Sequence, residues 1–421
     1  KEHDSAITKQ SSCYGNTLRP GEPATLTYYA LLLSALVLLL FGLVMVFSVQ
    51  SVTVAAQGQD AFTEFAKYLV FAVVGLAGMA AIARAPMRVL KRMAMPALVV
   101  ASLGQLLVYA PGVGSCVGGN CNWVRVPGIG TIQPSEFIKL ALCLYLGVMV
   151  TTRQDAFLPG VDTWRRFRRL AGWIVAPVLL AVALVLGGGD LGTVIVLALL
   201  VAGALWMGGL GWRWFAALGV LGLGGFTLLS ALSANRRARI IAWWHPDGAD
   251  PLDVGYQPKH GRWALGTGNW WGVGPGSSRQ KWGYLTQADS DYIFAVLGEE
   301  FGLIGTLIVI ALFAVIGWCC VRIIRRSHSL YVSVVTGGLM AWIVGQALIN
   351  MSVVVGLLPV LGVPLPLISK GGSALVSVLL AVGVLLALAR HEPGAPEALR
   401  ASGAAVRRTL AVIAPRRRNR A

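Results

Sequence analysis

The sequence predicts an all-α polytopic membrane protein, and two observations carry that prediction. Hydrophobic residues make up 56% of the 421-residue chain and charged residues only 13%, with a mean hydropathy of +0.70, values outside the range of soluble domains. Apolar runs long enough to cross a hydrocarbon core of about 30 Å also recur along the chain. Because isolated strands cannot satisfy their backbone hydrogen bonds in lipid, we expect these runs to be helices.

We expect ten transmembrane helices, with a large extracytoplasmic loop, residues 234–290, between the seventh and the eighth. The predicted spans are residues 28–49, 68–83, 94–111, 136–152, 172–187, 191–208, 213–233, 292–320, 331–355 and 373–390. They form a membrane domain over residues 28–390, flanked by tails at 1–27 and 391–421. The first run follows mostly polar residues and is too long for the apolar core of a signal peptide, so we do not expect its removal.

The positive charges predict the orientation, because short loops rich in Lys and Arg stay in the cytoplasm. Such clusters follow the second, fourth and eighth runs, and the chain ends on "APRRRNRA". Both tails are therefore expected in the cytoplasm. The net charge of +17 flanks spans rather than forming a separate basic domain, which favours contact with anionic membrane lipids and argues against nucleic-acid binding.

Two cysteines lie in "GSCVGGNCNW", in a connection that the topology places outside. We predict a disulfide between Cys116 and Cys121, because the extracytoplasmic environment is oxidising. Two free thiols are the alternative.

The loop 234–290 is the exception to the charge pattern. It carries seven basic residues and six tryptophans, and it contains the glycine-rich stretch "ALGTGNWWGVGPGSSRQKWG". One interpretation is a loop at the membrane surface whose basic residues contact lipid headgroups. The other is a site for an anionic membrane-anchored substrate such as a lipid-linked diphosphate, since clustered Arg, Lys and free backbone amides bind phosphate.

Polar residues inside the spans are candidates for function, because charge is costly there. Glu136 and Lys139 share a helical face and form either a structural ion pair or a substrate contact. Asp190, after three glycines, caps the sixth helix or serves a site. Gln346 and Asn350 are expected to hydrogen-bond to neighbouring helices.

The stretch "GLLPVLGVPLPLISKGGSALV" precedes the last span and contains three prolines that exclude a regular helix. Non-helical backbone at membrane depth must be buried in protein or line a cavity. We therefore expect this segment, with Lys370 and the amides around Ser373, to face a cavity shared with the loop 234–290.

Asp289 and Asp291 stand at the outer mouth of the eighth span. A carboxylate in a partly dehydrated, phosphate-binding cavity can act as a general base. Ser290 or Asp291 could equally be an ordinary helix N-cap. The residue pattern leaves both interpretations open.

Several stretches together resemble the SEDS family (shape, elongation, division and sporulation) of bacterial membrane proteins. They are "IQPSEFIKLAL", "GGDLGT", "SRQKWGYLTQADSDYIFAVLGEE" and the proline-rich stretch above, in the order of the family. The resemblance covers about residues 28–390. "SRQKWGYL" is closer to the division branch, FtsW-like, than to the elongation branch, RodA-like.

The resemblance implies a ten-helix fold with both ends cytoplasmic, in the bacterial cytoplasmic membrane and at the division septum. The implied activity is peptidoglycan glycosyltransfer, in which lipid II is polymerised into glycan strands. The essential aspartate of the family falls on Asp291, which implies a general base. Gln287 and Asp289 depart from the family's glutamate and histidine, and Lys370 stands where the family has a tyrosine.

The resemblance also implies a substrate site. Cations expected to neutralise the leaving diphosphate are Lys259, Arg262, Arg279, Lys281 and Lys370. Further expected substrate contacts are Trp123, Arg125, Glu136, Lys139, Asp190 and Ser373. A divalent cation, Mg²⁺ or Mn²⁺, would share the charge neutralisation, and the expected partners are a class B penicillin-binding protein and other division proteins. A lipid II flippase and a non-catalytic scaffold of the division complex are the competing functions.

Overall fold

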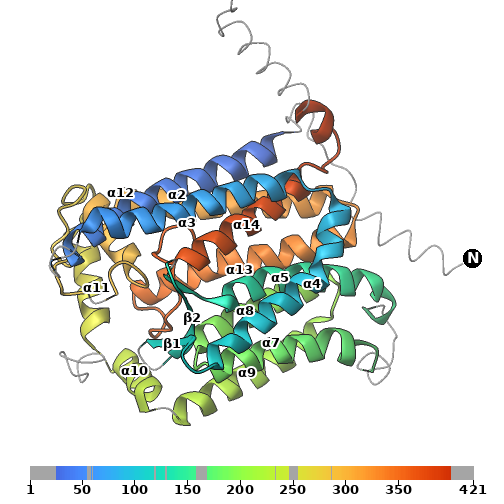
Figure 1. The fold of residues 1–421 in the computed structure, drawn as a ribbon, viewed down its shortest axis with the longest axis horizontal. Coiled ribbons are helices and arrows are strands. Elements are labelled where there is room, and N and C mark those ends of the chain that lie inside the picture. Colours follow the sequence, from blue (N-terminus) through green and yellow to red (C-terminus); the bar gives the residue numbers. More distant parts are fainter. Residues whose placement is uncertain are drawn as a thin grey trace, which may run out of the picture.

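The computed structural model describes residues 25–54, 58, 60–117, 120–128, 130–157, 168–232, 234–245, 255–285 and 287–399. Long helices form one bundle, and a small sheet and two short helices gather at one end of it (Figure 1). Most of the two predicted tails lies outside the described residues. The predicted helical class is confirmed for the bundle, whereas the sheet was not predicted.

A helix overlaps each of the ten predicted spans. These helices are α2 (Leu26–Thr53), α3 (Ala61–Arg84), α4 (Met87–Leu106), α5 (Pro134–Thr152), α7 (Ala176–Gly187), α8 (Leu191–Met207), α9 (Trp212–Leu232), α12 (Ile293–Arg326), α13 (Leu330–Val354) and α14 (Gly372–Ala389). A π-helical turn, Ala171–Val175, leads into α7. Eight helices of the described chain are long and apolar enough to cross a membrane, with α8 shorter and α9 outside that set. The protein is therefore a multi-pass membrane protein.

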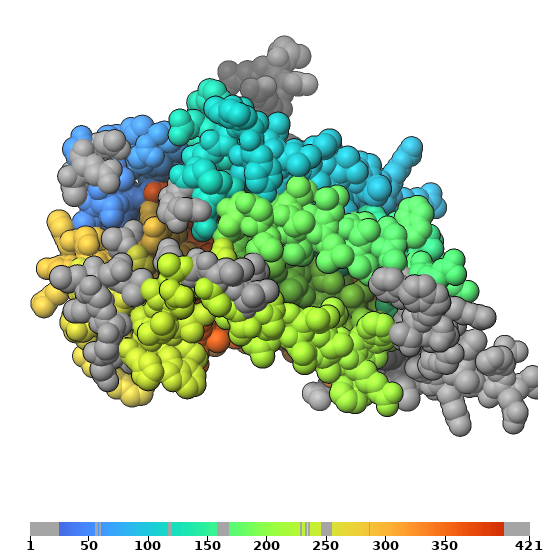
Figure 2. Space-filling view, turned by 90° about the horizontal axis from the view of Figure 1, so that it is seen from below, coloured from blue at the N-terminus to red at the C-terminus, as the bar shows by residue number. Residues whose placement is uncertain are grey.

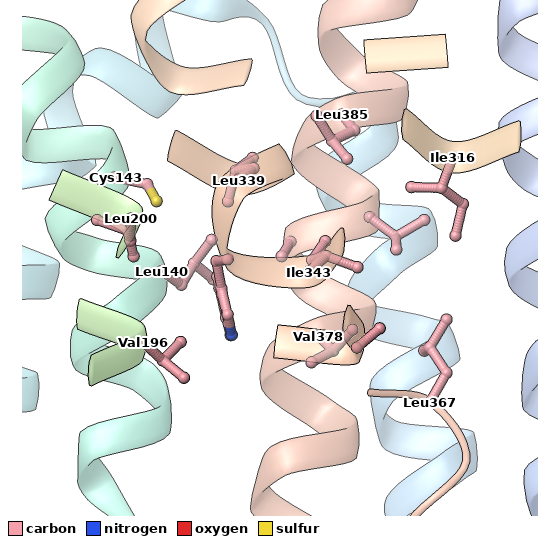
Figure 3. Close-up of a cluster of buried hydrophobic side chains, with 14 of the residues drawn as sticks. Leu140, Cys143, Val196, Leu200, Ile316, Leu339, Ile343, Leu367, Val378 and Leu385 are labelled. Atoms are coloured by element: carbon pink, nitrogen blue, oxygen red, sulfur yellow. The ribbon is translucent and has the colours of Figure 1, made fainter. Parts of the chain in front are cut away.

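The core of the bundle lies around α13 and α14. Helix α13 packs against α5, α8 and α12, and α14 packs against α3 and α5. Figure 3 shows the apolar side chains that meet there, among them Leu140 of α5, Leu200 of α8, Ile343 of α13 and Val378 of α14. Helices α9 and α10 (Ala234–Trp244), yellow-green in Figure 2, lie on the outside of the molecule. The exposed apolar faces of the outer helices suit lipid rather than water.

The starts of three helices decide between the capping alternatives. Helix α5 begins at Pro134, a residue that lacks the N–H that a first turn leaves unbonded. Helix α8 is capped by Asp190, whose Oδ1 accepts from the Thr193 N–H at 2.8 Å. Helix α12 has Tyr292 as its N-cap and no side-chain capping bond. The alternative that Ser290 or Asp291 caps this helix is therefore wrong.

Helix α12 is broken at Gly302, whose φ of 67° is left-handed. The non-helical segment that follows α11 crosses the break and hydrogen-bonds to the backbone groups that the break leaves without helical partners. Val273 N–H donates to Glu299 O at 2.9 Å, and Leu303 N–H donates to Asn269 O at 2.8 Å. The approach is so close that a methyl group on Gly302 would lie 2.4 Å from the Gly272 nitrogen. Only glycine fits here, for both space and φ.

Within its described residues, 234–245, 255–285 and 287–290, the loop 234–290 contains two helices, α10 and α11 (Tyr256–Thr267). The sheet beside them is antiparallel, in the order β1 (Gly114–Val117), β2 (Asn120–Val126) and β3 (Gly130–Ile132). Helix α2 starts and α14 ends at the opposite end of the bundle (Figure 1). There the Thr27 hydroxyl donates to Glu392 Oε2 at 3.1 Å. The two ends of the described chain thus share one side of the bundle.

Candidate functional site

A cavity of about 310 Å³ opens where β2, α8, α10 and the proline-rich segment meet. The polar groups on its wall come from Asn120, Asp190, Ser230, Arg236 and Arg239, and the segment around Pro359 to Gly362 closes one side. A smaller cavity, about 40 Å³, shares Arg239, Pro359 and Val360 and adds Arg262 and Trp243. The proline-rich segment shares both cavities with the loop 234–290, as predicted, but Lys370 and the residues around Ser373 line neither of them.

The proline-rich segment is non-helical between α13 and α14, as predicted, and side chains of α13 hold its backbone. Gln346 Nε2 donates to Pro364 O at 2.7 Å, and Asn350 Nδ2 donates to Val363 O at 2.8 Å. The prediction that these two residues hydrogen-bond to neighbouring helices is confirmed for Gln346, whose Oε1 accepts from Lys139 of α5, whereas Asn350 donates to non-helical backbone. A loop buried among helices has few ways to satisfy its carbonyl groups, and these bonds supply them.

The same segment also fixes the residues before α12. Asn350 Nδ2 donates to Asp291 O at 2.8 Å, the Ser369 hydroxyl donates to Ser290 O at 2.6 Å, and Lys370 N–H donates to Asp289 O at 2.7 Å. Each of the three consecutive carbonyl groups thus accepts a hydrogen bond, and these bonds fix the backbone that carries Asp291.

The Asp291 carboxylate lies beside the wall of the larger cavity. A methyl group at Gly362, which lines that cavity, would be 3.8 Å from Asp291 Oδ2. Within the described part of the chain no hydrogen bond or ion pair reaches this carboxylate, although the backbone around it is fully engaged. A carboxylate held in place but left without a partner is available for a reacting group.

Burial raises the pKa of Asp291 from 3.8 to about 6. The nearby Arg239 guanidinium opposes this rise in pKa, while the negative charges of Asp190 and Asp289 add to it. Burial also raises the pKa of Asp190, against the hydrogen bonds from Thr193. A carboxylate whose pKa lies close to neutral is a stronger base than an ordinary aspartate while still ionised at pH 7.

Some of the expected site residues are brought together here. Asp190 lines the cavity, and its Oδ2 accepts from Gln133 Nε2 at 3.1 Å. The Gln133 N–H in turn donates to Ser373 Oγ at 3.0 Å. Arg262 lines the smaller cavity, and Lys370 forms a partly exposed ion pair with Asp289 at 2.8 Å.

Other expected residues lie away from the two cavities. Lys281 is only 1% exposed and forms an ion pair with Glu300 at 2.9 Å. The Glu300 carboxylate, rather than a substrate phosphate, therefore neutralises the Lys281 charge. Lys259 lies over the Trp263 ring on the surface, and Arg279 is exposed.

Glu136 and Lys139 form a buried ion pair at 2.8 Å inside the bundle. Lys139 also donates to Gln346 Oε1 at 3.2 Å, and Glu136 Oε2 accepts from the Ser377 hydroxyl. With partners on every side, the pair joins α5, α13 and α14, and the geometry favours the structural interpretation over a substrate contact.

Sequence reasoning did not single out Arg236 and Arg239, the two basic residues on the wall of the larger cavity. Arg236 Nη2 donates to Gly189 O at 2.8 Å, which ties α10 to the turn before α8. Their i,i+3 spacing in "NRRARI" would place both on one face of a helix, and that was the available signal.

The β1–β2 hairpin carries Cys116 and Cys121, which are joined by the predicted disulfide. Trp123 and Arg125 lie on β2, where Trp123 pairs with Ser115 and the exposed Arg125 pairs with Thr131. The first residue of β2, Asn120, reaches the cavity wall.

A resident metal would find few ligands here. The described residues contain no group of three His, Cys, Asp or Glu side chains that could hold an ion. Asp190 and Asp291 are the carboxylates at the cavity. This set fits Mg²⁺, which is commonly held by one or two carboxylates together with substrate phosphates and water.

Fold and site together define the class: multi-pass helical membrane proteins with an arginine-lined cavity at one end of the bundle, beside an aspartate whose carboxylate has no partner among the described residues. Residues 29–393 match the cell cycle protein family FtsW/RodA/SpoVE. The chain belongs to this family, and the resemblance seen in the sequence motifs is confirmed.

Relatives include the probable peptidoglycan glycosyltransferase FtsW of Mycobacterium tuberculosis, 33% identical over 90% of this chain and 71% of that protein. The stage V sporulation protein E of Bacillus subtilis is 35% identical over 86% of this chain and 96% of that protein. Among solved structures, a chain of a peptidoglycan synthase complex superposes with a TM-score of 0.70 at 22% identity, covering 87% of this chain and 98% of that one. The rod-shape-determining protein RodA of Thermus thermophilus has a TM-score of 0.61 at 22% identity, covering 87% and 97%.

Proposed function

We propose that this protein is a peptidoglycan glycosyltransferase that polymerises lipid II at the outer face of the bacterial cytoplasmic membrane, during synthesis of the septal wall. The observation that carries the proposal is the Asp291 carboxylate, unpartnered within the described chain and with a raised pKa, beside a cavity lined by Arg236 and Arg239. Relatives named as probable peptidoglycan glycosyltransferases, which this chain matches over most of their length, support the proposal.

The proposed topology has ten membrane crossings and both termini in the cytoplasm. The ten helices that overlap the predicted spans support the count. The positive-inside rule supports the orientation, since the basic connections lie at the end of the bundle where α2 starts and α14 ends. The cavity, the sheet and α10–α11 then face the outside, where a lipid-linked sugar presents its headgroup.

In the proposed reaction Asp291 removes the proton from the 4-hydroxyl of the acceptor sugar. The resulting oxygen nucleophile attacks the anomeric carbon of the donor sugar, and the bond from that carbon to the diphosphate breaks. The negative charge that develops on the leaving diphosphate is neutralised by Arg236 and Arg239, with Arg262 at the neighbouring cavity. These arginines take the role that the sequence suggested for Lys281.

The remaining charged residues hold the site in shape. Lys370 neutralises Asp289 next to the base, and Asp190 fixes the start of α8 through Thr193. A Mg²⁺ or Mn²⁺ ion would bind through Asp190 or Asp291 and the substrate phosphates, and it would add positive charge at the diphosphate. A class B penicillin-binding protein that crosslinks the new strands, together with other division proteins, is the proposed partner.

The test compares the wild type with Asp291→Asn in a purified system with labelled lipid II, the transpeptidase partner and a divalent cation. We expect glycan polymer from the wild type alone. Equal polymer from both proteins would reject Asp291 as the base. No polymer from either protein, together with movement of lipid II across liposomes that contain the wild type, would favour the flippase. Neither activity, with stimulation of the partner transpeptidase by both proteins, would favour the scaffold.

A further inference from the structure

The disulfide lies one residue from the cavity wall. Cys116 and Cys121 face each other in register on β1 and β2, and the bond joins them directly. Asn120, the residue before Cys121, lines the larger cavity. The start of β2 is therefore part of the cavity wall.

The same end of β2 holds the turn between α7 and α8. Cys121 N–H donates to Gly188 O at 2.8 Å, and Asn122 Nδ2 donates to the same oxygen at 3.1 Å. Asn122 is fully buried, and its Oδ1 accepts from Gln105 Nε2 at 3.4 Å. The contact is close, because a methyl group on Gly188 would lie 2.1 Å from Asn122 Oδ1.

The turn held in this way carries two charged groups of the cavity. Gly189, next to Gly188, accepts through its carbonyl from Arg236 Nη2 at 2.8 Å. Asp190 follows and accepts from Thr193 and Gln133. A continuous set of contacts thus runs from Cys121 through Gly188 and Gly189 to the Arg236 guanidinium.

We propose that the Cys116–Cys121 disulfide is a positioning element for the anion-binding wall of the cavity: it holds β2 against Gly188 and thereby places Arg236 and Asp190 for a lipid-linked diphosphate. The substrate class rests on the proposed function. Cys116 is exposed, so a dithiol can reach the bond. Reduction transfers two electrons and two protons from the dithiol, leaving two cysteine thiols and the oxidised reductant.

The closing experiment uses the full-length protein in detergent, oxidised or reduced with a dithiol, and a Cys116→Ser/Cys121→Ser variant. Two quantities are measured: amide hydrogen exchange in peptides that cover residues 185–195, and the apparent KM and kcat for lipid II. We expect reduction to speed exchange in this turn and to raise KM by about tenfold, the size of a lost hydrogen bond to a charged group. We also expect kcat to fall, because Arg236 neutralises charge that develops on the leaving diphosphate. Reoxidation should restore all of these values.

The variant is the matched control. It should resemble the reduced wild type and be insensitive to the dithiol, because the free thiols of the described chain, Cys143, Cys319 and Cys320, are buried in the bundle. Unchanged exchange at 185–195 on reduction would overturn the proposal. Faster exchange with an unchanged KM would show that the bond only stabilises the hairpin, which would overturn it as well. If the oxidised wild type makes no polymer, the proposed function fails, whereas the exchange measurement still decides whether the disulfide holds the turn.

Discussion

Two pairs of carboxylates stand near the start of α12, and their surroundings differ. Glu299 and Glu300, inside the helix, are buried, at 0% and 1% exposure. Asp289 and Asp291, just before the helix, are only partly buried, and Asp291 lies beside the cavity. The four residues carry the same functional group within twelve positions of the chain, so their roles must come from what surrounds them.

Both glutamates are engaged by side-chain or backbone partners, although the buried Glu300 Oε2 has none among the described residues. Glu299 accepts from the Ser278 hydroxyl and from the N–H groups of Arg279 and Gln280. Glu300 accepts from Ser48 at 2.7 Å and pairs with Lys281 at 2.9 Å. Both glutamates tie the loop to the broken part of α12, where Gly302 interrupts the helix. Their charge is used to hold the chain together.

Of the two aspartates, only Asp291 shows the opposite arrangement. Lys370 satisfies Asp289, whereas the Asp291 carboxylate has no partner within the described residues, although its backbone is held by Asn350. The comparison teaches that backbone restraint without side-chain partners marks the reactive carboxylate, and that side-chain partners mark the structural ones. Each prediction below tests one side of this contrast.

The largest effect is expected at Asp291. Asp291→Asn should lower the polymerisation rate by about 10²–10⁴-fold, because the amide cannot accept the acceptor's proton. The thermal unfolding temperature should be unchanged, since no partner of the carboxylate is lost. Polymerisation of labelled lipid II and thermal unfolding in detergent are the two measurements.

Glu299→Gln is the matched control for that variant. It removes a carboxylate eight residues away whose role is to bind the loop, so it should lower stability and preserve the rate per folded molecule. A variant pair in which Glu299→Gln lost turnover and Asp291→Asn lost stability would reverse the assignment.

How far the sequence could predict this arrangement depends on the range of the forces involved. Span length follows from the thickness of the hydrocarbon core, so each predicted run overlaps a helix. The prolines exclude a helix in their own segment, and Asp190 caps the helix that begins next to it, so both effects are local and both are seen. The break in α12 could not be predicted from "EEFGLIG", because it depends on hydrogen bonds to a non-helical loop segment some thirty residues earlier in the chain.

The basic residues of the loop show the same limit. The loop carries seven basic residues, of which the resemblance assigned four to the phosphate, Lys259, Arg262, Arg279 and Lys281, and the fold distributes the seven differently. Lys281 forms a buried ion pair with Glu300, and Lys259 lies over the Trp263 ring. Arg236 and Arg239 reach the cavity only because α10 forms. The β-hairpin was missed because its short strands carry no long alternating pattern.

The next largest effect concerns the buried pair on the structural side. Lys281→Met should destabilise the protein by about 3–5 kcal/mol, because it leaves the Glu300 charge buried and without its counter-ion. The free energy of unfolding in mixed micelles, followed by circular dichroism, measures this loss. Turnover of the molecules that remain folded should persist.

The double variant Lys281→Met/Glu300→Leu separates charge from packing. It removes both charges, and we expect it to regain most of the lost stability. A double variant as unstable as the single one would show that shape, and not the unpaired charge, causes the loss.

A smaller effect is expected from pH. A general base works when deprotonated, and the pKa of Asp291 lies at about 6, above the ordinary 3.8. The rate should therefore be level above that pH and fall about tenfold for each further unit of acidity below it. A pH profile of kcat/KM checks this, with circular dichroism at each pH to confirm that the fold is intact. A rate that stayed level down to about pH 4 would contradict the raised pKa.

The smallest effect should come from the partly exposed pair beside the base. Side-chain exposures of 41% for Lys370 and 21% for Asp289 mean that breaking their ion pair should cost under about 1 kcal/mol of stability. The two single variants should nevertheless move the acid limb of the pH profile in opposite directions. Asp289→Asn removes a negative charge that raises the pKa of Asp291, so the limb should shift to lower pH. Lys370→Met removes a positive charge next to the site, so the limb should shift to higher pH. Shifts of under about one pH unit are expected at this exposure. Equal shifts in one direction would show that the pair acts by holding the backbone of Asp289, rather than through the field at Asp291.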